Sequence, residues 1–412
     1  MIALVMLIFF ALAPICIVLP TIFCYITIKK EINIILYSVI IAFFFGIAGY
    51  WFINPATDPD LVRYLQILGQ YSGKSLFESF NLVYSNLYAL DIYFHFISLL
   101  GNKQLLPAIS VFLFYFITFY ILGDYKLRTK IKNKDFAIYI FFVISAINFC
   151  SIVNGIRWPL AFAFFFLAFY RESIQKKRNI ATIVLYIISI LFHFSTLVFV
   201  ILRLLLFIKN KKLVVIMGGA AVFSPKIIEI LANNLIGINS TIPGVNQIIY
   251  FINRANMYFQ WQGGEWADIV RESQYYKLEA IYYYFIVMAF VVVFLNIYKN
   301  RNEDNKKIRN LKKQESFVFY LLIVTIVSFT MSAHTYIRFI IPLVISFCIF
   351  TFKIYTDDKF INLKVTFNIC LFIFSIMGIV LNLTLLKSMM NIGDYFTNLF
   401  TTGILRTILG NF

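Results

Sequence analysis

Long apolar segments alternate with short polar segments along nearly the whole chain. None of the apolar segments shows the every-second-residue alternation of a half-buried strand. A segment buried in lipid must also satisfy its backbone hydrogen bonds internally, as a single helix does. The pattern therefore predicts an all-α helical bundle whose apolar runs span a membrane, at residues 2–28, 33–53, 105–123, 136–153, 157–170, 180–208, 213–236, 280–298, 316–333, 337–352 and 365–386.

Composition sets the number of spans. Hydrophobic residues make up 61% of the sequence and charged residues 13%, a balance outside the range of soluble domains. A span takes roughly 20 residues, so 412 residues accommodate about 11 to 12 transmembrane helices. We expect one polytopic integral membrane domain covering residues 1–412. Its first run is too long for a cleavable signal peptide and has no basic segment before it, so we interpret it as the first span.

Basic residues fix the expected orientation. Short segments between apolar runs hold 24 of the 36 Lys and Arg residues, and such segments stay on the cytoplasmic side. The net charge of +17 follows from these loops, so it does not indicate a nucleic-acid partner. The segments are Lys29 to Lys30, Lys126 to Lys134, Arg171 to Arg178, Lys209 to Lys212, Lys299 to Lys313 and Lys353 to Lys364.

This orientation has two local consequences. The outer loop 54–104 must return to the membrane without adding a crossing, so its segment 82–100, which carries Asp91 and His95, is expected to be a re-entrant or interfacial helix. The apolar run 180–208 must cross an even number of times. We expect a helical hairpin bent near residues 193–195, with a single tilted span as the alternative.

Arg157 is the first candidate for function, in the stretch Asn154-Gly-Ile-Arg157-Trp158-Pro159 that opens an apolar run. An arginine at the threshold of a span should face an aqueous cavity or an anionic partner. Proline suits the first turn of a helix, and the start of a helix attracts phosphate oxygens. The alternative is an arginine that merely extends its charge to the membrane surface.

A second candidate group lies in the outer loop. Asp60, Arg63 and Tyr64 would share one face of a helix that starts near residue 59. Asp60 would serve as a base toward a sugar hydroxyl, Arg63 would hold phosphate, and Tyr64 would offer a ring for stacking. The alternative is an aspartate that caps the helix and forms an ion pair within it.

Histidines and aromatic residues complete the outer face. His193 lies in an apolar run and needs a polar partner, for catalysis or for packing. His334 and Arg338 open another span and repeat the arrangement at Arg157. In the long outer loop 237–279, aromatic rings mixed with charges suit sugar binding or anchoring at the membrane interface. The residues singled out in this loop are Arg254, Trp261, Glu265 and Trp266.

The sequence contains no motif for nucleotide binding, zinc binding or paired cysteines. The chain has no Walker lysine loop, no GxGxxG and no HExxH, and its five cysteines form no CxxC pair. We therefore expect no metal, no cofactor and no soluble sugar nucleotide. A membrane-borne activated substrate fits better.

Taken together, three motifs resemble the EpsG/Wzy family of bacterial polysaccharide polymerases. They are Asp60-x-x-Arg63-Tyr64, then Asn154-Gly-Ile-Arg157, then Leu-Phe-His193-Phe-Ser 36 residues after the arginine. The resemblance covers roughly residues 35–210. Family members commonly carry a glutamine after the arginine, where this chain has Trp158.

The resemblance implies a glycosyltransferase of the bacterial inner membrane with a periplasmic active face. It would extend the O-antigen of lipopolysaccharide, or a related surface polysaccharide. The growing glycan would pass from undecaprenyl diphosphate to the non-reducing end of a lipid-linked repeat unit, without a metal. Expected partners are these lipid-linked oligosaccharides, membrane lipids, a chain-length regulator and a flippase.

In this mechanism Arg157 and Arg338 stabilise the departing diphosphate, and His193, His334 or Asp60 takes the proton of the acceptor hydroxyl. Two other functions stay open. A flippase or transporter for lipid-linked oligosaccharides also uses cationic cavities but usually shows an internal repeat. A membrane acyltransferase that modifies sugars also uses a membrane histidine, beside a donor tunnel open to the cytoplasm.

Overall fold

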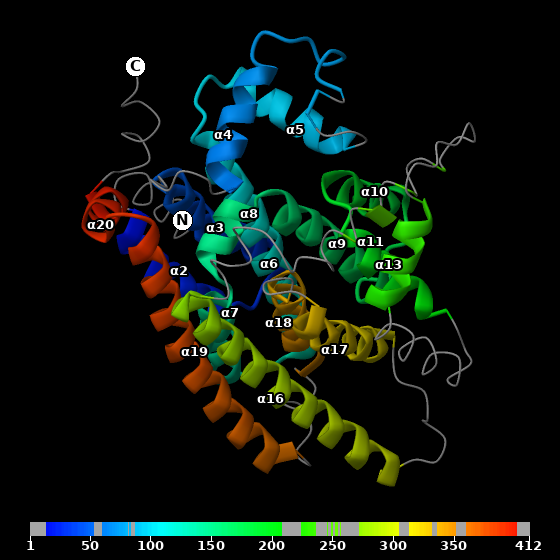
Figure 1. Cartoon of the computed structure of the whole chain (residues 1–412). Coiled ribbons are helices and arrows are strands. Elements are labelled where there is room, and N and C mark those ends of the chain that lie inside the picture. Colours follow the sequence, from blue (N-terminus) through cyan, green and yellow to red (C-terminus); the bar gives the residue numbers. More distant parts are fainter. Residues whose placement is uncertain are drawn as a thin grey trace. The chain divides into compact units, whose positions relative to one another are not determined.

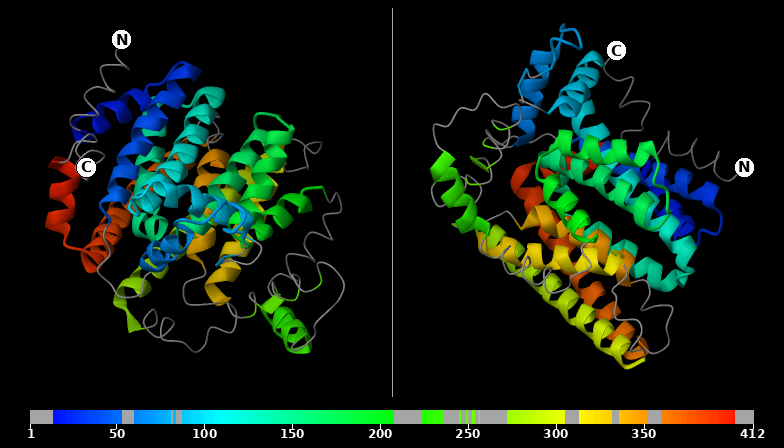
Figure 2. Two further views of the ribbon diagram at one scale, coloured as in Figure 1. Left: turned by 90° about the horizontal axis from the view of Figure 1, so that it is seen from above. Right: turned by 90° about the vertical axis from the view of Figure 1, so that its right-hand side faces the viewer.

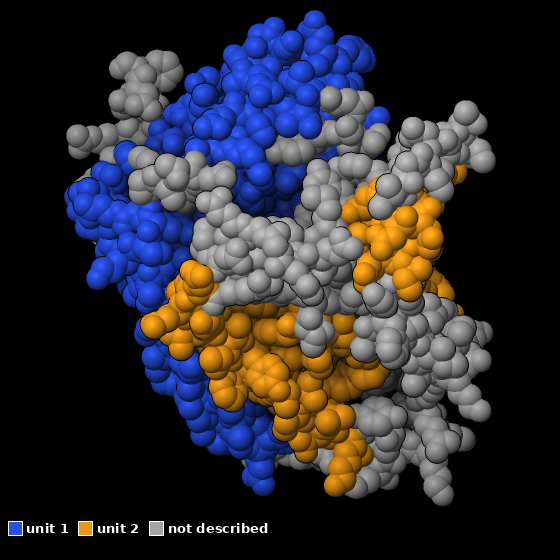
Figure 3. All heavy atoms as spheres, viewed as in Figure 1, with its two compact units in different colours: residues 1–200, 351–412 blue, residues 201–350 orange. Residues whose placement is uncertain are grey.

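The computed structural model describes residues 14–52, 60–80, 82–83, 87–207, 224–235, 272–304, 313–331, 336–351 and 360–401, and single positions between 245 and 256 (Figure 1). Its regular elements are helices, and no strand occurs among the described residues, so the all-α prediction is confirmed. The chain divides into two compact units, residues 1–200 with 351–412 and residues 201–350 (Figure 3). The single transmembrane domain stays a prediction.

The first unit contains most of the helices. In chain order they are α2 (Pro14–Ile26), α3 (Glu31–Tyr50), α4 (Asp60–Tyr71), α5 (Tyr88–Leu99), α6 (Leu105–Thr129), α7 (Asn133–Ala146), α8 (Phe149–Gly155), α9 (Arg157–Ser173), α10 (Ile180–Phe192), α19 (Ile361–Met389) and α20 (Ile392–Thr401). Helix α11 (Thr196–Leu205) begins in this unit and ends in the second. The second unit contains α13 (Ser224–Leu235), α16 (Gln274–Asp304) and α17 (Lys313–Met331), and nearly all of α18 (Ile337–Thr351).

Four helices in the described residues are long and apolar enough to cross a membrane, or up to five if the bent pair α7–α8 counts as one span. The four are Glu31–Tyr50, Leu105–Thr129, Gln274–Ile297 and Asn362–Met389. This number is below the expected 11 to 12. Other apolar helices, such as α10 and α11, are shorter than 18 residues, and the runs near residues 2–13 and 208–223 lie outside the described residues.

Close packing between α3 and α6 forms the centre of the first unit. A Cβ atom on Gly49 would lie 3.1 Å from the Pro107 carbonyl oxygen, so the glycine allows the two backbones to approach. Nearby, the rings of Phe45 and Tyr115 stack with their centroids 3.8 Å apart. The connection that contains α4 and α5 runs from the end of α3 to the start of α6.

Helices α4 and α5 pair and project beyond the other helices of their unit (Figures 1 and 2). The Tyr71 hydroxyl donates to Asp91 Oδ1 at 2.6 Å, and Ser79 Oγ lies 3.0 Å from His95 Nδ1. Asp91 and His95 are both buried. The helix expected over 82–100 is therefore present from Tyr88, and its polar residues face α4 and the turn that follows it. Its placement at a membrane surface stays a prediction.

The run 180–208 is broken as predicted. Helix α10 ends at Phe192 and α11 starts at Thr196. Tyr186 of α10 and Phe199 of α11 both contact Phe165 of α9, with ring centroids 5.5 Å away in each case. Because residues on either side of the break pack on the same ring, the chain turns back on itself there. The predicted bend near residues 193–195 is confirmed, and that each half crosses the membrane stays a prediction.

The run 136–153, expected to be one span, is a bent pair of helices, and that it forms a single span stays a prediction. Helix α7 ends at Ala146, α8 starts at Phe149, and their axes differ by 54°. Asn148 caps α8 by accepting a hydrogen bond from the Ser151 backbone N–H at 3.1 Å. This break sets the direction of the short helix that leads to Arg157.

Candidate functional site

Arg157 is the first residue of α9, as the sequence predicts. Helix α8 ends at Gly155, and Ile156 interrupts the helix with φ 21° and ψ −61°. Such a backbone conformation is rare for a β-branched residue and holds only where its surroundings impose it. Pro159 lies in the first turn of α9, where its missing N–H has no helical partner to lose. Arg157 thus lies at the positive end of the α9 dipole.

Gly155 and Trp158 fit together at this junction. A Cβ atom on residue 155 would lie only 2.3 Å from Trp158 Nε1, so no larger residue fits there without movement. The indole is buried. The Trp158 ring thus occupies the space that Gly155 leaves empty.

The structure brings Arg157 to the motif in the outer loop. Its Nε donates to the Tyr64 hydroxyl at 3.0 Å, and its guanidinium carbon lies 5.3 Å from the Tyr64 ring centroid. The Arg63 guanidinium carbon lies 5.8 Å from the same centroid, and Arg63 forms an ion pair with Asp60. We call Asp60, Arg63, Tyr64 and Arg157 the arginine–tyrosine site.

Exposure assigns different roles within this site. The side chains of Arg63 and Asp60 are 51% and 50% exposed, and Arg157 is half-buried. The sequence led us to expect that the Tyr64 ring stacks on a sugar. Tyr64 is only 1% exposed, so its ring is not available for stacking. Its ring instead packs beside the guanidinium groups of Arg63 and Arg157. Guanidinium groups placed side by side are suited to an anionic group with several oxygens.

Helix α5 packs against Tyr64. The Phe94 ring lies 6.1 Å from Tyr64 and 5.7 Å from Tyr71, between centroids. The neighbouring Tyr93 packs on Phe192, the last residue of α10, at 5.6 Å. Helix α5 therefore connects the arginine–tyrosine site to the helix end that precedes His193.

His193 finds a polar partner within its own turn. Its Nδ1 accepts a hydrogen bond from the Ser195 backbone N–H at 3.1 Å and lies 2.8 Å from the Ser195 hydroxyl. A backbone N–H can only donate, so Nδ1 carries no proton, and the neutral ring is protonated on Nε2. In this arrangement His193 offers a donor at Nε2.

The remaining predicted site residues lie in the second unit or outside the described residues. Arg338 is the second residue of α18 in the second unit and is half-buried. Its cooperation with Arg157 stays a prediction. His334, Arg254, Trp261, Glu265 and Trp266 lie outside the described residues.

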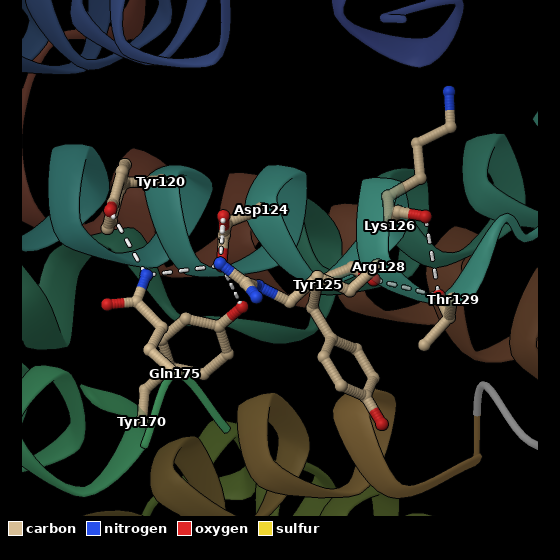
Figure 4. Close-up of polar contacts among 8 residues, drawn as sticks. All are labelled: Tyr120, Asp124, Tyr125, Lys126, Arg128, Thr129, Tyr170 and Gln175. Carbon is tan, nitrogen blue, oxygen red and sulfur yellow. Dashed lines mark hydrogen bonds and ion pairs between the residues drawn. The ribbon is translucent and has the colours of Figure 1, made fainter. Parts of the chain in front are cut away.

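A second polar cluster, which the sequence did not reveal, lies at the other end of α9 (Figure 4). The Asp124 carboxylate of α6 accepts hydrogen bonds from Arg128 Nε at 2.7 Å, from Gln175 Nε2 at 3.2 Å and from the Tyr170 hydroxyl. Gln175 also donates to the Tyr120 hydroxyl at 3.3 Å. We call these five residues the α6–α9 clamp, because they join the ends of the two helices.

Asn382 of α19 is a further residue that the sequence analysis missed. It makes hydrogen bonds to the backbone on both sides of the α7–α8 break. The sequence feature that could have revealed Asn382 is an amide within a long apolar helix, where a polar group is costly unless it has hydrogen-bond partners.

No group of three His, Cys, Asp or Glu residues that could hold a metal ion occurs within the described part of the chain. Comparisons with protein-family models, curated proteins and solved structures give no match. The resemblance to the EpsG/Wzy family therefore rests on the sequence motifs alone.

Proposed function

We propose that this protein is a polytopic membrane glycosyltransferase that polymerises a lipid-linked polysaccharide, such as the O-antigen, at the periplasmic face of the bacterial inner membrane. In this proposal 11 to 12 helices span the membrane, and the donor is a glycan on undecaprenyl diphosphate. The observation that carries the proposal is the Tyr64 ring with Arg157 and Arg63 beside it. Two motifs of the resemblance, separated by 93 residues, supply this one site.

The arrangement matches the demands of a diphosphate leaving group. Guanidinium groups bind phosphate oxygens through two parallel hydrogen bonds, and a helix N-terminus adds favourable potential. When the glycosidic bond to the carrier breaks, negative charge grows on the diphosphate. Arg157 at the start of α9, with Arg63 beside it, stabilises that charge, which is the largest contribution a site of this kind makes.

Asp60 is the proposed base. The acceptor hydroxyl attacks the anomeric carbon, the carbon–oxygen bond to the diphosphate breaks with its electron pair, and the hydroxyl proton passes to the Asp60 carboxylate. Asp60 is half-exposed and next to Arg63, so a sugar can reach it beside a bound diphosphate. His193 serves as a donor through Nε2, since its Nδ1 already accepts a hydrogen bond.

The test is a gel of surface glycolipid from cells that lack the gene, complemented with wild type or Arg157→Ala. We expect the deletion to leave single-repeat glycolipid, with the ladder restored by wild type but not by Arg157→Ala. The matched control is Arg178→Ala: its side chain is 63% exposed in the segment expected to be cytoplasmic, and it should restore the ladder.

Other outcomes select the alternatives. Loss of the single-repeat band as well would indicate a flippase or transporter. An unchanged ladder with an altered sugar substituent would indicate the acyltransferase. A normal ladder from Arg157→Ala at equal protein level removes the arginine–tyrosine site from the reaction.

A further inference from the structure

The break between α7 and α8 leaves backbone groups without helical partners. A helix that bends by 54° cannot keep its i to i+4 hydrogen bonds across the bend. In a lipid environment water does not replace the lost bonds, so another part of the protein must supply them. The groups concerned lie on residues 145–149.

One side chain from the far end of the sequence makes these bonds. Asn382 Nδ2 donates to the carbonyl oxygens of Ser145 at 2.8 Å and Ile147 at 3.5 Å. Asn382 Oδ1 accepts from the Phe149 backbone N–H at 3.2 Å. Both sides of the break are therefore held by one primary amide. Only asparagine and glutamine carry a neutral donor and acceptor in this arrangement.

Two further contacts fix how α19 lies along α7 and α8. Near the start of both α7 and α19, Lys364 Nζ lies 2.8 Å from Asp135 Oδ2. Near their other ends, Asn154 Nδ2 donates to Met389 Sδ at 3.5 Å. Helix α19 thus runs parallel to α7 and α8, and Asn382 lies between these two contacts. Helix α19 cannot slide along α7 and α8 without losing both of these contacts and the Asn382 hydrogen bonds.

The short α8 transmits this constraint to the site. It has seven residues, and Arg157 follows two residues after its end. We propose that Asn382 is a positioning residue: it holds the α7–α8 break, and thereby sets the direction of α8 and places Arg157 against Tyr64. The link to catalysis rests on the proposed function, whereas the hold on the break does not.

Cys150 provides a reporter of the break that does not depend on activity. It is the second residue of α8 and is 1% exposed. In a full-length variant with the other four cysteines replaced by serine, we would measure alkylation of Cys150 by N-ethylmaleimide in native membranes. Removing one partner of these part-buried hydrogen bonds should shift the local opening equilibrium by roughly tenfold, so Asn382→Ala should be alkylated about ten times faster.

Three variants calibrate this measurement. Asn382→Gln keeps a donor and an acceptor and should retain most of the protection. Thr384→Ala is the matched control, since Thr384 is exposed on the same helix and its hydroxyl bonds to Val380 of its own turn. If Asn382→Ala does not accumulate in the membrane, Asn382→Ser, with a shorter polar group, takes its place.

The glycolipid ladder is measured on the same variants. The proposal expects Asn382→Ala to lose both the protection of Cys150 and the ladder at equal protein level. Unchanged protection of Cys150 overturns it, whatever the ladder does. Lost protection with a normal ladder also overturns it, because the break then does not govern Arg157. If deletion of the gene leaves the ladder intact, the polymerase proposal fails, and the alkylation rates alone decide whether Asn382 holds the break.

Discussion

Aspartate, arginine and tyrosine side chains meet at both ends of α9, but the aspartate is half-exposed at the start of the helix and buried at its end. At its start, one aspartate faces two arginines around a buried tyrosine, and the Asp60 and Arg63 side chains are 50% and 51% exposed. At its end, one aspartate faces one arginine, and the Asp124 side chain is 7% exposed. The clamp balances its charges internally. The arginine–tyrosine site has two arginines and one aspartate, and the half-exposed Asp60 and Arg63 side chains make it accessible, so in the proposed function it binds an anion.

The clamp should therefore matter for stability and the site for chemistry. Asp124→Ala leaves the Tyr170 hydroxyl and the Gln175 amide without their shared acceptor. Losses of this kind cost about 1 to 3 kcal/mol each, so the variant should show a clearly lower thermal midpoint in detergent. Polymer yield should fall only in proportion to the amount of folded protein.

Arg157→Ala should behave in the opposite way, with a nearly unchanged midpoint and polymer reduced roughly a hundredfold, as for removal of one stabilising donor in an active site. A midpoint shift as large as that of Asp124→Ala would mean that both ends of α9 are structural. Midpoints and ladders from the same membrane preparations decide between these outcomes.

The next effect concerns the junction that presents Arg157. Gly155→Ala forces a methyl group against the Trp158 indole, where the structure leaves 2.3 Å. Overpacking of this kind costs roughly 1 to 3 kcal/mol, and the shift would also turn the start of α9. We expect less folded protein and less polymer, measured together.

A second substitution sharpens this prediction. Trp158→Gln introduces the residue common in the resembling family and removes the ring that the methyl group meets. The double variant should recover much of what Gly155→Ala loses, with a coupling energy of about 1 kcal/mol or more for residues in direct contact. Simple addition of the two single effects would show that the indole is not the obstacle.

Some of this arrangement could be predicted from the sequence. Helical spacing placed Asp60, Arg63 and Tyr64 together, and the Arg157 stretch predicted a helix start. Crossing parity predicted the break after α10. These features depend on local periodicity, on basic loops and on residues whose charge is costly in lipid, all of which a single sequence displays.

The rest depends on contacts between distant segments. Nothing local shows that Tyr64 is buried beneath Arg157, 93 residues away. The α7–α8 break carries no proline or glycine, the usual signals, and its stabilising partner lies more than 230 residues further along the chain. Asp124 lies between the apolar run 105–123 and the basic segment that starts at Lys126, and the sequence pattern assigned it no role.

A smaller effect tests how Arg157 is held. Tyr64→Phe keeps the ring beside both arginines but removes the hydroxyl that accepts from Arg157 Nε at 3.0 Å. A hydrogen bond to a charged group contributes about 1.5 to 3 kcal/mol at most, and a half-buried arginine can recover part of it from water. We expect polymer yield to fall by roughly threefold to tenfold, well short of the loss in Arg157→Ala.

Tyr64→Ala is the comparison that gives this result meaning. It removes the ring as well, so both arginines lose their shared support, and the loss should approach that of Arg157→Ala. Equal effects of the Phe and Ala variants would place the whole role of Tyr64 in its hydroxyl. Initial rates of ladder formation in membranes measure the difference.

The smallest effect lies in the turn that joins α4 to α5. The Ser75 backbone N–H and hydroxyl donate to Glu78 Oε2 at 2.7 and 2.8 Å, and these hydrogen bonds lower the pKa of Glu78. A carboxyl group with a lowered pKa stabilises the fold above its unfolded pKa of about 4.3, and that stability is lost as pH falls through the lower folded value. Hydrogen exchange of residues 75–80, corrected for intrinsic rates, should therefore show weaker protection as pH falls below about 4, and Glu78→Gln should remove this dependence. Because the carboxylate is fully exposed, salt screens the Lys74 contribution, and the change should stay within the turn. If hydrogen exchange near Arg157 showed the same pH dependence, the turn at residues 75–80 and the start of α9 would open together. The arginine–tyrosine site would then depend on this turn for its stability.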